Sequence, residues 1–219
     1  MLTCLRAGVR ASARAGILRR ALCAADSSDV DVDYFAVLNT ERCFDVERQT
    51  LAAAYKAQMV LCHPDRFAGA SEAEQGEAQR RSAAVTHAYS VLRRPHSRAS
   101  HLLQLLGAGW EHEPPSAEAA GQQSELVSMP FLMSVMEWRE QIEEAAGCDA
   151  ALAAVRAEVD GLVAHNTEQL GSAFTELLES DSDTDGENEA LQEAQRLTAE
   201  LQYLRRMEDE IKELSKPDD

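Results

Sequence analysis

Apolar residues in the first half of the chain recur at the spacing of α-helices. Between residues 45 and 62 they line one helix face from Leu51 to Cys62, with a single polar interruption at Gln58. A second run, 71–94, opens with Ser71 and Glu74 at the spacing of a capping box. Shorter helices are predicted at 33–38 and 98–106, and we expect Asp45 to cap the first long helix.

Three longer segments in the second half of the chain repeat this helical pattern. The first, 128–146, has Pro130 in its first turn and Gly147 after its last, as helix ends favour. The second begins near Asp149 as its expected cap and reaches Leu177, and the third spans 189–214. Three amphipathic helices with short connections favour an antiparallel bundle. Because no stretch alternates as a strand does, the fold class is predicted to be all-α.

The tripeptide His63-Pro64-Asp65 separates the first two long helical runs. Pro64 has a fixed φ and no amide hydrogen, so a helix cannot continue through it. The preceding residue, His63, is pushed toward extended backbone. The pattern therefore predicts a helical hairpin that exposes an imidazole and a carboxylate on a stiff turn. Alone, such a tripeptide is usually only a turn, so its flanking residues decide its meaning.

Charge is unevenly distributed along the 219 residues, whose net charge is −17. Residues 1–25 hold five arginines and no acid, so the remaining chain sets 16 basic against 38 acidic residues. Such a body would repel nucleic acid and anionic membranes, and it favours either a basic partner or simple solvation. No apolar run reaches the roughly 20 residues of a membrane-spanning helix.

The five cysteines are scattered and form no C-x-x-C pair. The sequence therefore predicts neither a disulfide framework nor a zinc site, and it fits a reducing compartment. No cofactor or metal ligand set is predicted.

Residues 1–25 are rich in arginine and alanine, which is the composition of a mitochondrial transit peptide. Arginines interrupt every apolar stretch that a secretory signal would need. We therefore predict a mitochondrial matrix protein that is processed soon after Arg19-Arg20, with a disordered basic tail as the alternative. The predicted divisions are a transit peptide at 1–25, helical domains at 29–106 and 128–216, and a linker at 107–127 that contains Trp110.

The first domain resembles a J-domain, because Tyr55-Lys56 precedes His63-Pro64-Asp65-Arg66-Phe67 between two antiparallel helices. Further matches to one family of J-domain proteins are Asp33-Tyr34-Phe35, Ala68, Ser82-Ala83, Ala88-Tyr89, Arg98-Ala99 and Leu102-Leu103. Together they resemble the HscB family, the J-type co-chaperones of iron–sulfur cluster assembly. Val85-Thr86-His87 departs from the Asn-containing stretch that is common there, and His87 is assigned no role. The four-cysteine module of many animal members is not found, so the resemblance is to the shorter form.

This resemblance implies that the hairpin turn docks on a DnaK-type mitochondrial heat-shock ATPase chaperone. The implied contact residues are His63, Pro64, Asp65, Lys56 and Arg66. Asp65 would pair with an arginine of the ATPase, His63 would orient the loop or bond to the partner, and Pro64 would prevent helix formation. Lys56 would steer the hairpin toward an acidic patch.

The second domain contains Phe131-Leu132-Met133 followed by Met136-Glu137 and Arg139-Glu140. Methionine and leucine at this spacing more often belong to a core. The family resemblance instead implies a face that binds an iron–sulfur scaffold protein of the IscU type. The implied residues of that face are Leu132, Met133, Met136, Glu137, Glu140 and Tyr203.

Two other functions remain open on the sequence alone. A J-domain co-chaperone for unfolded clients is disfavoured because no Gly/Phe-rich segment or zinc ribbon is present. A calcium-binding helical protein is suggested by Asp181, Asp183, Asp185 and Gly186, but Gln192 replaces the bidentate glutamate of an EF-hand. We interpret 179–189 as a solvated acidic turn whose serines could accept phosphate. An enzyme is least favoured, because no nucleophile, base and oxyanion donor converge.

Overall fold

The computed structural model describes residues 32–108, 110, 126–179 and 185–215. The predicted transit peptide, most of the predicted linker and much of the acidic turn, including Asp181 and Asp183, lie outside the described residues. The described residues contain helices and no strand, which confirms the all-α prediction. In chain order these are α2 (Tyr34–Leu38), α3 (Arg48–Cys62), the 3-10 helix η1 (Pro64–Phe67), α4 (Glu72–Leu92), α5 (Pro95–Leu105), α7 (Met129–Glu144), α8 (Asp149–Glu179) and α9 (Asp185–Leu214).

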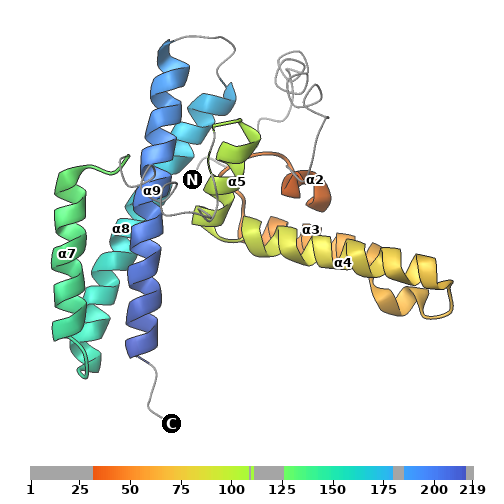
Figure 1. Ribbon diagram of the computed structural model, residues 1–219, viewed down its shortest axis with the longest axis horizontal. Helices are drawn as coiled ribbons and strands as arrows, with labels where there is room; N and C mark the ends of the chain where they lie inside the picture. The colour runs from red at the N-terminus through yellow and green to blue at the C-terminus, as the bar shows by residue number, and fades with distance from the viewer. Residues whose placement is uncertain (1–31, 109, 111–125, 180–184, 216–219) are drawn as a thin grey trace.

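The hairpin of α3 and α4 projects sideways from a bundle of α7, α8 and α9 (Figure 1). The capping box that starts α4 is confirmed: Glu74 N–H donates to Ser71 Oγ, and Ser71 N–H donates to Glu74 Oε2. The Ser71 hydroxyl also donates to Glu74 Oε2, and this bond, together with the one from the Ser71 N–H, favours the ionised carboxylate and lowers the pKa of Glu74. Asp33 caps the short helix α2, which packs across the base of the hairpin.

The prediction that Asp45 caps α3 is wrong. The helix begins at Arg48, and the residue at its N-cap position, Glu47, makes no side-chain capping bond. The chain before it turns so that Phe44 enters the core, which leaves Asp45 facing α8. A Cβ atom placed on Gly171 of α8 would lie 2.9 Å from Asp45 Oδ2, so a larger residue there would displace this carboxylate.

Helix α5 joins the hairpin to the bundle, and both halves contribute to one continuous hydrophobic core. Phe44 stacks on Phe174 of α8 with ring centroids 5.3 Å apart. The guanidinium of Arg98 lies 4.9 Å from the Phe44 ring centroid and donates to the carbonyl of Leu92. Burial disfavours its charge and lowers the pKa of Arg98. Trp110, from the predicted linker, is buried in the same core.

The bundle is built mainly from α8 and α9, and α7 packs against both. Ser128 caps α7. Pro130 lies in the first turn of this helix, as predicted. Asp149 is the first residue of α8 and not its cap, and α9 begins at Asp185, earlier than predicted. Of the helices that the structure describes, none combines the length and apolarity needed to cross a membrane.

Candidate functional site

Residues 63–67, called the tip here, form the turn at the far end of the hairpin. His63 ends α3 with an extended backbone, φ −63° and ψ 130°, as expected before proline. Its Nδ1 accepts a hydrogen bond from the Asp65 N–H at 3.3 Å and lies 3.6 Å from Asp65 Oδ2. The Asp65 side chain is 89% exposed, so its carboxylate is available to a partner.

Arg66 ties the tip to the end of α3. Its Nη1 donates to the carbonyl of Val60 at 2.7 Å, which satisfies one of the carbonyls that a helix C-terminus leaves open. No side chain of the 3-10 helix η1 is buried. The tip is therefore shaped by proline stereochemistry and by local hydrogen bonds, and it contributes nothing to the core.

The exposed side of α3 leads directly to the tip. Lys56 is exposed, and Lys56, Val60 and His63 are separated by four and three residues, so they follow one side of the helix. Val60 and Leu61 are 62% and 63% exposed, which is unusual for large apolar side chains. Sequence reasoning missed both, although their positions between the stripe residues Met59 and Cys62 were available as a signal.

A shallow groove runs beside the tip between α3 and α4. It is lined by Met59, His63, Pro64, Gln79, Ser82, Ala83, Thr86, His87 and Ser90. The hydroxyls of Ser82, Thr86 and Ser90 donate to backbone carbonyls of α4 itself. His87 Nε2 lies 3.0 Å from the Tyr34 hydroxyl, which gives this histidine a packing contact between α4 and α2.

The second predicted site lies on the outer side of α7. Met133, Met136, Glu137 and Glu140 are all exposed, whereas Val135 and Ile142 on the same helix are buried. The two methionines are 59% and 73% exposed, so they do not belong to the core that their spacing alone would favour.

Leu132 and Tyr203 are half-buried at the border of this surface. The Tyr203 ring lies edge-on to the Phe131 ring, with ring centroids 6.3 Å apart. The guanidinium of Arg206 lies 5.7 Å from the centroid of the Tyr203 ring. Met129, one turn before Met133, is 70% exposed and extends the surface. The name α7 face is used below for Met129, Leu132, Met133, Met136, Glu137, Glu140 and Tyr203.

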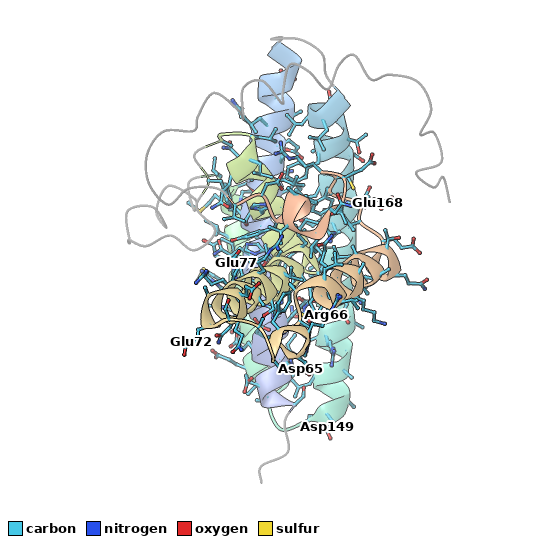
Figure 2. The ribbon with its side chains drawn as sticks, turned by 90° about the vertical axis from the view of Figure 1, so that its right-hand side faces the viewer. Asp65, Arg66, Glu72, Glu77, Asp149 and Glu168 are labelled. Atoms are coloured by element: carbon cyan, nitrogen blue, oxygen red, sulfur yellow. The ribbon has the colours of Figure 1, made fainter. Side chains whose placement is uncertain are left out.

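The tip and the α7 face lie on opposite sides of the molecule. In Figure 1 the hairpin ends on the right and α7 lies on the left. Figure 2 views the hairpin end-on, with Asp65 and Arg66 in front of the bundle helices. One chain can therefore present both surfaces to different partners. Among the described residues, no group of three or more His, Cys, Asp or Glu side chains could hold a metal ion.

Comparison with known proteins agrees with this architecture. Residues 127–212 match the family model described as the HSCB C-terminal oligomerisation domain. A co-chaperone protein HscB homolog from Pseudoalteromonas atlantica is 36% identical over 180 residues, covering 82% of this chain and 94% of that protein. A homolog of the same description from Burkholderia mallei is 34% identical over 177 residues, covering 77% of this chain and 91% of that protein.

Solved structures show the same fold. The crystal structure of human co-chaperone protein HscB gives a TM-score of 0.69 at 27% identity, covering 88% of this chain and 86% of that one. Chaperone HscB from Vibrio cholerae gives a TM-score of 0.64 at 25% identity, covering 83% of this chain and 96% of that one. The fold thus defines a helical co-chaperone with J-domain helices and a C-terminal helical bundle. The chain belongs to the HscB co-chaperone family.

Proposed function

We propose that this chain is an adaptor of iron–sulfur cluster biogenesis with two separate binding surfaces. The tip and Lys56 bind a DnaK-type heat-shock ATPase chaperone and stimulate its ATP hydrolysis. The α7 face binds an IscU-type scaffold protein, so that the chain delivers the scaffold and promotes cluster transfer to acceptor proteins. The chain activates a partner's ATPase and is not itself an enzyme. Its J-domain spans 29–106 and its scaffold-binding domain spans 128–216.

The observation that carries the proposal is the separation of the two surfaces on one chain of this family. The Asp65 carboxylate is almost fully exposed on a turn that local bonds hold in place. A carboxylate of this kind accepts charge-assisted hydrogen bonds from an arginine, which are among the stronger polar contacts. The α7 face combines exposed methionines, whose side chains adapt to a partner, with exposed glutamates that suit a basic partner surface.

We further propose that the protein acts in the mitochondrial matrix. Support comes from the arginine-rich, acid-free composition of residues 1–25. Expression of the full chain with a C-terminal fluorescent tag tests this location. Mitochondrial fluorescence is expected for the full chain and diffuse fluorescence for a variant without residues 1–25. Diffuse fluorescence of the full chain would contradict the proposed location.

The function is tested by the ATPase rate of a mitochondrial DnaK-type chaperone, measured with and without an IscU-type scaffold. The native chain should raise the rate, and the scaffold should raise it further. His63→Gln and Asp65→Ala should each abolish stimulation while scaffold binding, measured by calorimetry, stays intact. Loss of scaffold binding in these variants, or unchanged stimulation, would overturn the assignment of two surfaces.

A further inference from the structure

Three exposed methionines lie in a row along α7, which forms one edge of the bundle (Figure 1). Met129, Met133 and Met136 are 70%, 59% and 73% exposed, and their spacing of four and three residues places them on one side of the helix. By contrast, Met207 of α9 is 1% exposed within the core, and Met59 of α3 is half-buried. Among the described residues, the exposed methionines are therefore gathered on the α7 face.

A methionine thioether reacts with hydrogen peroxide where the oxidant can reach the sulfur. A sulfur lone pair attacks one peroxide oxygen and forms the S–O bond, while the O–O bond breaks and the departing hydroxide takes up the remaining proton as water. Sulfur loses two electrons and peroxide gains them, so no further reactant is needed. The product, methionine sulfoxide, is polar, and methionine sulfoxide reductases convert each of its two epimers back to methionine. Exposure thus selects the three α7 methionines for a reversible modification.

We propose that Met129, Met133 and Met136 form an oxidation site, and that their conversion to sulfoxides by hydrogen peroxide prevents scaffold binding. The effect on binding rests on the proposed function, whereas the oxidation site itself rests on the exposure of the three side chains. A thioether leaves water at little cost when it packs against an apolar partner. A sulfoxide oxygen that is buried in the same contact without a hydrogen-bond donor costs free energy.

The charged residues around the three methionines do not supply such a donor. Glu137 and Glu140, which share the α7 face, are ionised carboxylates and therefore only accept hydrogen bonds. The guanidinium of Arg139 is already paired with Glu210 of α9, with Nε 3.9 Å from Oε2. Oxidation consequently places new acceptors on a surface that is already rich in acceptors.

Peroxide footprinting tests the oxidation site on the full chain without a partner. The folded chain is treated with hydrogen peroxide, and the sulfoxide content of each methionine peptide is followed by mass spectrometry. Because oxidation follows exposure, the three α7 methionines should react at least about tenfold faster than Met207. In the chain unfolded by urea, all four should react at similar rates. Equal rates in the folded chain would overturn the oxidation site.

Scaffold affinity, measured by calorimetry before and after oxidation, tests the effect on binding. Catalase and then dithiothreitol are added after the peroxide, so that reversibly oxidised cysteines return to thiols. Oxidation should raise the dissociation constant for an IscU-type scaffold by about tenfold or more, with unchanged helical circular dichroism. Treatment with reductases for both sulfoxide epimers should restore the affinity. Unchanged affinity after complete oxidation of the three methionines, or a loss that the reductases do not reverse, would overturn the proposed effect.

The matched control is the triple variant Met129→Leu/Met133→Leu/Met136→Leu, which stays apolar and keeps every cysteine, including the exposed Cys148. Whatever its starting affinity, its dissociation constant should change less than about twofold on treatment with peroxide, because leucine has no sulfur to oxidise. An equal loss of affinity in the native chain and the variant would assign the effect to other residues and overturn the proposal. Absence of scaffold binding by the reduced native chain would contradict the proposed function itself, whereas binding that survives oxidation overturns the present inference alone.

Discussion

The tip and the α7 face are both exposed, yet the fold holds them in different ways. The tip buries no side chain of η1 and keeps its shape through Pro64, the Asp65–His63 hydrogen bond and the Arg66–Val60 hydrogen bond. The α7 face is held in place by core packing on the other side of its helix, where Val135 and Ile142 are buried. Substitutions at the tip should therefore alter function with little loss of stability, whereas loosening α7 should reduce stability and binding together.

The largest expected effect is at the anchor of α7. Ile142 is fully buried, so Ile142→Ala leaves a cavity and should lower the free energy of unfolding by about 2–5 kcal/mol. Scaffold binding should weaken as well, because the helix that carries the face loses its packing. Urea denaturation and calorimetry measure the two effects, with the exposed neighbour Gln141→Ala as the control. A destabilised variant with undiminished scaffold affinity would contradict the claim that the packing of α7 supports scaffold binding.

The next largest effect is a loss of scaffold binding that leaves the stability of the fold unchanged. Met133→Ala/Met136→Ala removes two exposed side chains from the centre of the α7 face and should weaken scaffold binding by roughly 1–4 kcal/mol. Thermal unfolding should stay close to that of the native chain. Leu214→Ala, which truncates another exposed side chain of the bundle, is the control for calorimetry. Unchanged scaffold affinity in the double variant would show that the face is wrongly assigned.

A smaller effect is expected at the tip. Arg66→Ala removes the hydrogen bond to the Val60 carbonyl and should cost about 0.5–1.5 kcal/mol of stability at most. ATPase stimulation should fall several-fold, because the carboxylate of Asp65 is less firmly placed. Arg80→Ala provides the comparison, since Arg80 is also exposed on the hairpin and pairs only locally with Glu77. Equal stimulation by the two variants would mean that the Arg66 bond does not position the tip.

The smallest effect is a pH dependence in the bundle. Burial, and then repulsion from Asp160 and Asp209, raises the pKa of Glu208 above its ordinary value of 4.5. The folded state thus holds this proton more tightly than the unfolded state, so stability falls as pH rises from 4.5 through the raised pKa. Glu208→Gln removes this loss.

Urea denaturation at pH 7 and at pH 4 measures the effect. The variant should exceed the native chain by a fraction of a kcal/mol at pH 7, and the difference should shrink at pH 4. A difference that grows toward acid pH would contradict the raised pKa.

The sequence predicted the helices and the local geometry of the tip, because both depend on near neighbours. Periodicity located the helices, Ser71 with Glu74 located a helix start, and Pro64 required a break. The position of Asp45 could not be predicted in this way. The Asp45 carboxylate lies against Gly171 of α8, a residue far away in the chain whose missing side chain leaves room for it.

Burial on α7 and α3 shows the same limit. Helical spacing alone cannot tell which of two apolar sides of a helix packs inward. The family resemblance implied that Met133 and Met136 face outward, and the structure places both at the surface. For Val60 and Leu61 the family resemblance implied nothing, and the one signal was their position between Met59 and Cys62, which face the hairpin. Likewise, the shared core that joins Phe44 to Phe174 depends on contacts between residues far apart in the chain.

The most direct test of the central claim asks whether both surfaces must lie on one chain. Asp65→Ala and Met133→Ala/Met136→Ala are assayed separately and as an equimolar mixture, with ATPase chaperone and scaffold both present. The account predicts that the mixture shows no scaffold-dependent increase above the methionine variant alone, because no molecule can join scaffold to chaperone. Recovery of the native scaffold-dependent rate by the mixture would contradict the account.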